Sequence, residues 1–168
     1  MINIKHIAYL FIFFIGVFLC SCNKTDEPPM KQPLPIQEQF VIESCSIDTS
    51  NEYLMTQCSA FSRKCYVVNA IDDYPSDNLG FSEAYYNIDF SSYTVLLYYR
   101  LHTWELETYK YRYYYDQSNN SYNWLIQIGL GDNVDGILNY RIFSRFAIKV
   151  KKIPINSDII ANDEVYDI

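Results

Sequence analysis

The second half of the chain is built from short apolar runs with the spacing of β-strands, and this pattern restricts the possible folds more than any other feature. Residues 93–99 form a continuous apolar run, YTVLLYY, which predicts a central strand covered on both faces. Residues 103–115, 124–130 and 146–151 alternate with a period of two, as strands with two different faces do. The sequence DQSNNS at 116–121 is typical of a hairpin turn. We therefore expect a mainly β domain, either a β-sandwich or a β-rich α+β fold.

The segment before these strands carries weaker signals. We expect a short helix near residues 52–61, a strand at 66–68 and a turn-rich loop at 72–78. The apolar run at 40–42 could open either a strand or a short helix. A single β-rich domain over residues 39–168 accommodates all of these elements, and its length suffices for a hydrophobic core without a metal or disulfide.

Composition and charge exclude several classes of protein. The chain has 17 Tyr, 10 Phe and 2 Trp but only 5 Gly and 6 Pro, which is not typical of disordered or collagen-like sequences. Its formal net charge is −7, and the predicted loss of Lys5 with a leader makes the chain more negative. Because nucleic acids bind basic surfaces, we expect no nucleic-acid partner. Lys149 and Lys151 lie on the polar face of the last predicted strand, where they would protect an exposed sheet edge.

The N-terminus has the organisation of a secretory leader. Residues 1–6 carry one cation, Lys5, and residues 7–18 form an uncharged apolar run. A run of this length is too short to span a bilayer comfortably, because a membrane helix needs about 20 apolar residues. We therefore expect residues 1–21 to be a cleaved signal peptide.

The end of this leader reads Leu19-Cys20-Ser21-Cys22, which resembles the bacterial lipobox. The resemblance implies that Cys22 is lipidated and becomes the mature N-terminus, so that several acyl chains hold the protein on the membrane. Cys20 fits the motif less well because bulky residues precede it. An ordinary signal peptide and an uncleaved anchor are the alternatives. We expect a bacterial envelope lipoprotein anchored to the outer membrane, on its periplasmic or cell-surface face.

The lipidated Cys22 is followed by a proline-rich segment that extends to residue 38. Residues 23–38 contain four of the six prolines, which favour extended polyproline II at about 3.1 Å per residue. We interpret residues 22–38 as the lipidated cysteine and a spacer. The acidic stretch NKTDE at 23–27 resembles an export signal for surface lipoproteins, and a plain solvated tether explains it equally well.

Residue types needed for catalysis or metal binding are scarce. The chain has no G-x-S-x-G motif and no Cys-x-x-Cys or His-Glu-x-x-His pattern. His102 is the one histidine outside the leader, and we expect it on the surface of a bend at residues 100–103 rather than in a catalytic role. The sequence DNVDG at 132–136 is better explained as a turn than as a calcium loop. We therefore expect no catalytic residue, no metal and no cofactor.

Three cysteines remain in the predicted domain. An exported protein meets oxidising surroundings, so one disulfide is consistent with the export signal. The pair Cys58 and Cys65 closes the smallest loop, across a polar segment that suits a surface turn. Pairing of Cys45 with either of the others, or three buried thiols, are the alternatives.

A cluster of aromatic residues is the one unusual functional signal. Residues 93–115 contain eight tyrosines and Trp104. The period of two places Tyr109, Tyr111 and Tyr113 on one face of a strand. Such a face either packs in the core or forms, with Trp104, a platform for a glycan or protein ligand. We favour the core, because the neighbouring apolar strands need a covering layer.

Two short blocks resemble known bacterial proteins. The sequence NIDFSSYTVLL at 87–97 is similar to the "IDFSKYTLL" stretch of small envelope lipoproteins of unassigned function. The sequence FAIKVKKIP at 146–154 is similar to their closing strand, and also to the C-terminal domain of protease-complex-type (PrcB-like) proteins. The resemblance implies a β-rich lipoprotein domain with no known reaction.

These observations favour a non-catalytic binding or interaction module. Its expected partners are the membrane, through the N-terminal lipid, and an envelope protein or a glycan. A periplasmic protein that associates with or inhibits a protease complex is one alternative, and a hydrolytic enzyme is another.

Overall fold

The computed structural model describes residues 31–75, 87–104, 106–130 and 140–167. The predicted leader, Cys22 and the turn at 132–136 lie outside these residues. The described part is mainly β and contains two sheets, as the strand patterns predicted.

The first sheet, sheet A, has four strands in the order β1-β6-β7-β9. Its strands are β1 (Lys31–Pro33), β6 (Leu106–Asp116), β7 (Ser121–Leu130) and β9 (Asp158–Asp167). The predicted turn at 116–121 joins β6 to β7 as an antiparallel hairpin. Asn120 adopts φ 51° in this turn, a conformation that asparagine tolerates better than most residues. β9 pairs with β7 in parallel.

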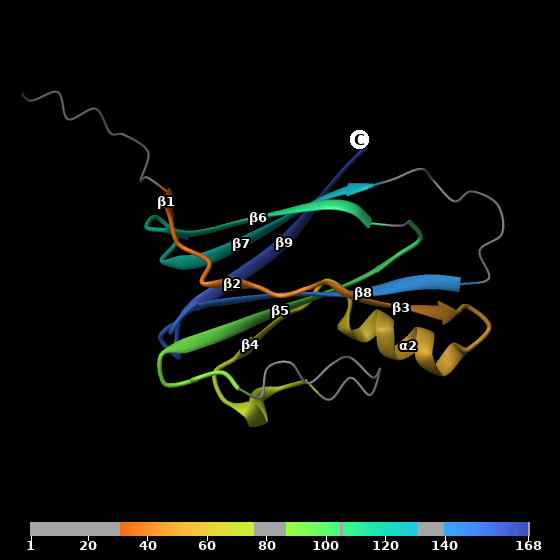
Figure 1. Cartoon of the computed structure of the whole chain (residues 1–168), viewed down its shortest axis with the longest axis horizontal. Coiled ribbons are helices and arrows are strands. Elements are labelled where there is room, and N and C mark those ends of the chain that lie inside the picture. Colours follow the sequence, from red (N-terminus) through yellow and green to blue (C-terminus); the bar gives the residue numbers. More distant parts are fainter. Residues whose placement is uncertain (1–30, 76–86, 105, 131–139, 168) are drawn as a thin grey trace, which may run out of the picture. The chain divides into compact units, whose positions relative to one another are not determined.

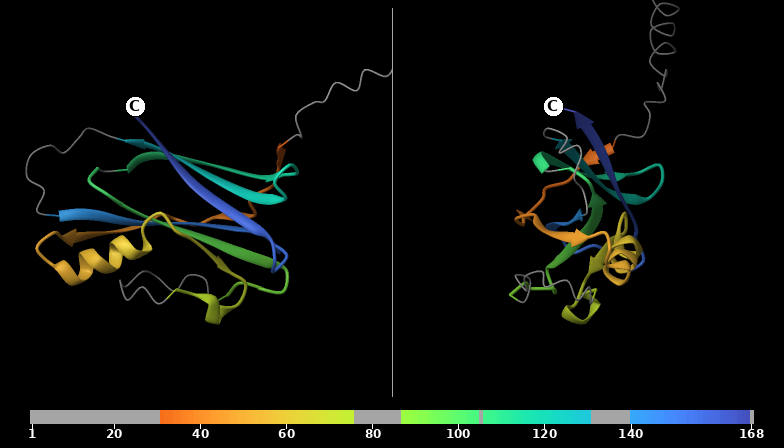
Figure 2. Two further views of the ribbon diagram at one scale, coloured as in Figure 1. Left: turned by 180° about the vertical axis from the view of Figure 1, so that it is seen from behind. Right: turned by 90° about the vertical axis from the view of Figure 1, so that its right-hand side faces the viewer.

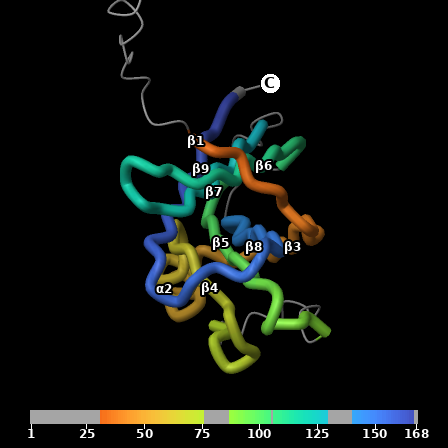
Figure 3. The backbone as a smooth tube through the Cα atoms, turned by 90° about the vertical axis from the view of Figure 1, so that its left-hand side faces the viewer, coloured from red at the N-terminus to blue at the C-terminus, as the bar shows by residue number. Residues whose placement is uncertain are grey.

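The second sheet, sheet B, has the order β2-β8-β5-β4, and β3 also pairs with β8 (Figures 1 and 3). Its strands are β2 (Glu38–Gln39), β3 (Glu43–Asp48), β4 (Cys65–Val68), β5 (Tyr93–His102) and β8 (Tyr140–Lys151). All of its pairings are antiparallel.

The main core lies between the two sheets. Sheet B contributes Leu96 and Tyr98 from β5 together with Phe146, Ile148 and Val150 from β8. Sheet A contributes buried residues from β6 and β7, namely Tyr113, Trp124, Ile126 and Ile128. The intervening residues of β5, such as Val95 and Leu97, face the opposite side of sheet B and are also fully buried. The prediction that residues 93–99 form a central strand covered on both faces is therefore confirmed.

The second face of sheet B is covered by helix α2 (Glu52–Phe61), which matches the predicted helix (Figure 2). Asn51 caps the helix, because its Oδ1 accepts a hydrogen bond of 3.1 Å from the backbone N–H of Leu54. Cys58 packs with Val95, Leu97 and neighbouring residues to form this second core. The turn-rich loop includes a short 3₁₀ helix, η2 (Ile71–Asp73).

The first two described strands begin inside the segment that was predicted to be a spacer. β1 pairs with the end of β6, and β2 pairs with β8 through Glu38 and Gln39. Pro33 is compatible with β1 because this strand is at a sheet edge, where a missing backbone N–H costs little. A free spacer can therefore comprise only residues that precede Lys31.

Two expectations about the last strands are wrong. β8 is an interior strand, bonded to β5 on one side and to β2 and β3 on the other, so Lys149 and Lys151 do not protect a sheet edge. Lys149 instead forms an ion pair with Glu38 and lies 5.3 Å from the ring centre of Tyr93. The final strand is β9, which the sequence pattern did not reveal because apolar Ile160 lies on its exposed face and polar Asp163 on its inner face, so the alternation is broken.

Candidate functional site

An open depression of about 480 Å³ lies where β5 ends beside the last turn of α2 and the first residues of β8. Three arginines line it, Arg63, Arg100 and Arg141. The other lining residues are Ser59, Ser62, Leu101, His102, Thr103 and Trp104. We call this feature the arginine depression.

The register of sheet B creates the depression. On one edge of β5, β4 pairs only with Val95–Tyr98. The residues of β5 after Tyr98 therefore have no strand partner on this edge within the described part of the chain. The segment after α2 bonds to them instead: the N–H of Arg63 donates to the carbonyl of Tyr99 at 2.7 Å, and the N–H of Leu101 donates to Oγ of Ser62 at 3.0 Å. These bonds hold the end of the helix against the end of the strand.

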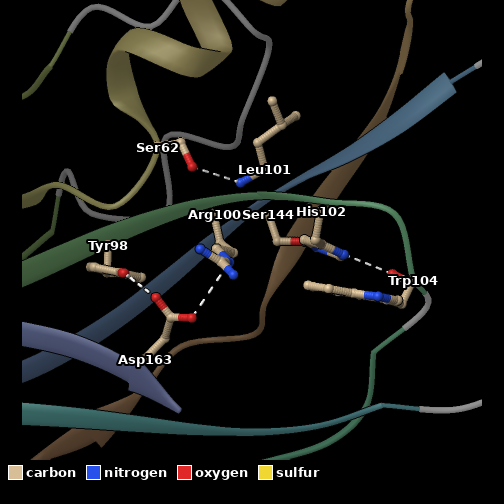
Figure 4. Close-up of polar contacts among 8 residues, drawn as sticks. All are labelled: Ser62, Tyr98, Arg100, Leu101, His102, Trp104, Ser144 and Asp163. Carbon is tan, nitrogen blue, oxygen red and sulfur yellow. Dashed lines mark hydrogen bonds and ion pairs between the residues drawn. The ribbon is translucent and has the colours of Figure 1, made fainter. Parts of the chain in front are cut away.

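Arg100 is the buried arginine of the site, with 7% of its surface exposed. Its Nε lies 3.4 Å from Oδ2 of Asp163 on β9, and its guanidinium carbon lies 5.9 Å from the ring centre of Trp104 (Figure 4). Asp163 also accepts a hydrogen bond from the hydroxyl of Tyr98. Within the described part of the chain, Asp163 is the one ion-pair partner of Arg100, and the contact uses Nε.

His102 is buried, contrary to the expectation of a surface residue. Its ring stacks on Trp104, with centroids 5.5 Å apart and planes 13° apart. Nδ1 lies 2.7 Å from the carbonyl oxygen of Trp104, and Nε2 lies 2.8 Å from Oγ of Ser144. Desolvation lowers the pKa of His102, and the positive charge of Arg100 lowers it further. The imidazole is therefore neutral at pH 7, with Nδ1–H as donor and Nε2 as acceptor.

The hydrogen bond between His102 and Ser144 has the residue types of a base and a nucleophile. Ser144 is fully buried, however, and it does not line the arginine depression. Its Oγ continues the chain of hydrogen bonds to Oγ of Ser44, 2.7 Å away on β3. These hydrogen bonds join strands β3, β8 and β5.

The charge of the depression contrasts with that of the whole chain. The sequence has five arginines and a net charge of −7, yet three of the arginines line this one surface. Neither Arg63 nor Arg141 forms an ion pair with any described carboxylate. No carboxylate lines the depression in the described ranges. The site therefore presents an excess of positive charge to solvent.

The predicted aromatic platform is divided by the fold. Tyr113 is buried in the main core, with 5% of its surface exposed. Tyr111 packs against the same core, and its ring centre lies 5.6 Å from that of Trp124. Tyr109 is 38% exposed at the other end of the row. The structure thus places most of this face between the sheets. It brings Trp104 to the arginine depression instead, beside His102 and Arg100.

The structure places Cys58 and Cys65, the expected disulfide pair, in different surroundings. Cys58 is fully buried in the core beneath α2, whereas Cys65 packs against the core between the sheets. The two side chains therefore lie on opposite faces of sheet B. Burial raises the pKa of the Cys65 thiol to about 12, which keeps it protonated and unreactive.

Sequence analysis did not identify Arg63 or Arg141 as site residues. They are 78 positions apart, and no motif connects them. The sequence shows only that Arg63 directly follows the predicted helix; its φ of 60°, a conformation usually given to glycine or asparagine, is visible only in the structure.

The described ranges contain no group of three or more His, Cys, Asp or Glu side chains that could hold a metal ion. None of the helices found there is long and apolar enough to cross a membrane.

Comparison with known proteins gives no relative from which a function could be transferred. No protein-family model matches the chain, and neither curated proteins nor solved structures give a significant match.

Proposed function

We propose that this protein is a lipid-anchored envelope protein that acts as a non-catalytic binding module and holds its ligand in the arginine depression. The observation that carries the proposal is the convergence of three arginines, an aromatic ring and several hydroxyl groups on one open surface. A concave surface with a few convergent polar groups is the usual form of a small-molecule site. The ligand is a glycan or a segment of another envelope protein.

Binding is favoured over catalysis by the state of the one histidine in the site. Both ring nitrogens of His102 are already engaged, by Trp104 and by Ser144. A general base must reach a substrate proton directly or through one water molecule. The remaining lining residues are arginines, hydroxyls and apolar groups, which recognise a ligand without a base to activate it.

Binding is tested with the full-length protein in detergent on a glycan array and in a pull-down from envelope extract. The variant Arg63→Gln/Arg141→Gln is run in parallel, with Arg112→Gln on the exposed part of β6 as the matched control. We expect ligands that the wild type and Arg112→Gln retain and the double variant loses. Ligands retained equally by all three proteins would contradict the assignment of the depression. Capture of a protease complex would favour the alternative role as a protease-associated protein.

The lipid anchor has its own test. Mass spectrometry of the native N-terminus should show acylated Cys22, and Cys22→Ser should abolish acylation. Cys20→Ser is the matched control and should leave acylation intact. A retained leader or an unmodified N-terminus would overturn this part of the proposal.

A further inference from the structure

We infer that the ligand of the arginine depression is an acidic saccharide, bound through a carboxylate or sulfate group. This inference rests on the proposed binding function and specifies the class of ligand.

The arginines provide recognition of an oxyanion. A guanidinium group offers parallel N–H donors that match the two oxygens of a carboxylate or sulfate. Arg100 lies with its Nε 3.4 Å from Oδ2 of Asp163 and with its guanidinium carbon over the ring of Trp104. Arg63 and Arg141 are exposed and carry no described counterion, so they can close on an anion from solvent.

Hydroxyl and aromatic groups beside the arginines suit a sugar better than a simple anion. The Oγ of Ser62 accepts the backbone N–H of Leu101, which leaves its own O–H free to donate. Ser59 and Thr103 add two further hydroxyls, and Trp104 adds an aromatic ring that is partly exposed. Sugars combine apolar ring faces with many hydroxyl groups, so this set is complementary to them.

The negative charge of the chain as a whole restricts the ligand to a short one. Charges separated by more than about 8 Å are largely screened at physiological ionic strength, so the arginines act only on groups inside the depression. A long polyanion would extend over a surface whose net charge is −7. The cavity of about 480 Å³ is within the range of small-ligand sites. A short acidic oligosaccharide, or the acidic end of a longer neutral one, meets these requirements.

Calorimetric titration of the full-length protein in detergent tests the inference with four probes. These are a trigalacturonate, a sulfated disaccharide, a neutral trisaccharide and inorganic phosphate. We expect binding of the trigalacturonate, the sulfated disaccharide or both, at least about tenfold tighter than the neutral sugar, because charge-assisted hydrogen bonds are added. Binding of the trigalacturonate identifies the acidic group as a carboxylate, and binding of the sulfated disaccharide identifies it as a sulfate.

Variants connect this binding to the site. Arg63→Gln and Arg141→Gln should each weaken binding of the acidic sugar by about tenfold or more, whereas Arg112→Gln should bind like the wild type. Circular dichroism confirms that each variant is folded. Equal affinity for the neutral sugar, tighter binding of free phosphate, or unchanged affinity in both site variants would overturn the inference.

Failure of this inference can be distinguished from failure of the proposed function. If the arginine variants lose a ligand that is a neutral glycan or a protein, the binding function stands and the acidic-saccharide assignment is wrong. If the folded wild type retains no ligand that depends on the arginines in the array, the pull-down or the titrations, both fail.

Discussion

At the scale of single residues, Arg63 combines an unfavourable backbone conformation with an exposed charge. Its φ of 60° is in the left-handed region, which costs an L-residue with a side chain roughly 1 kcal/mol relative to glycine. Arg63→Gly should therefore raise the free energy of unfolding by about 0.5–1 kcal/mol while it weakens ligand binding. Chemical denaturation and calorimetric titration of the same variant measure the two effects. A variant that is both less stable and fully able to bind would contradict the role given to this residue.

His102 should make stability depend on pH in a defined window. Its folded pKa is lowered from 6.5, so the unfolded chain takes up a proton first as the pH falls. The contribution of His102 to the free energy of unfolding is therefore fully present above pH 6.5. It decreases as the pH falls from 6.5 toward the folded pKa. The aspartates whose pKa values are lowered, Asp48, Asp89 and Asp116, titrate below 3.8 and do not interfere.

Denaturation midpoints between pH 7 and pH 5 measure this dependence. We expect the midpoint of the wild type to fall over this range, and that of His102→Gln to change less, because glutamine has no proton to gain. Parallel curves for the two proteins would show that another group is responsible.

Arg145 is a buried cation that depends on its partner. It is 1% exposed, and desolvation lowers its pKa to about 10, so it remains charged at neutral pH. Glu43 forms its ion pair, and the hydroxyl of Tyr74 accepts a hydrogen bond of 3.1 Å from it. Glu43→Ala should lower the free energy of unfolding by about 3 kcal/mol, because it removes an ion pair with a buried guanidinium. Glu38→Ala, at the more exposed pair with Lys149, should cost less than about 1 kcal/mol in the same assay.

At the scale of elements, strand β6 passes from the core to the solvent along one row of tyrosines. Tyr111 packs against the main core, whereas Tyr109 is 38% exposed. Tyr111→Ala should therefore cost about 2–4 kcal/mol, and Tyr109→Ala less than about 1 kcal/mol. Thermal unfolding compares the two, and a melting temperature of Tyr111→Ala within a degree or two of wild type would contradict the core position.

At the scale of the whole molecule, the segment 31–39 joins the two sheets. Its first residues pair with β6 in sheet A, and its last residues pair with β8 in sheet B. Between them, Leu34 and Ile36 pack against the core that separates the sheets. The segment closes one side of the main core and is therefore part of the fold.

Two truncations test this role. A chain that begins at Lys31 keeps both strands, whereas a chain that begins at Phe40 loses them together with two core residues. We expect the shorter chain to be less stable by about 3 kcal/mol or more, since each lost side chain alone contributes roughly 1.5 kcal/mol when buried. Urea denaturation of the two chains provides the comparison, and equal midpoints would mean that residues 31–39 are a spacer after all.

The local elements could be predicted from the amino-acid pattern alone. Alternation identified the β6–β7 hairpin, continuous hydrophobicity identified β5 as a strand buried on both faces, and the predicted helix at 52–61 is α2. These features depend on neighbouring residues, whose side-chain period decides which face is apolar.

The site and the sheet boundaries depend on contacts between segments that are distant in the sequence. The arginine depression exists because β4 stops pairing with β5 at Tyr98 and the end of α2 takes its place. The parallel pairing of β9 with β7 and the entry of residues 31–39 into both sheets are likewise contacts between distant segments. No local pattern encodes them, because they depend on which exposed strand edges remain when the two cores have formed.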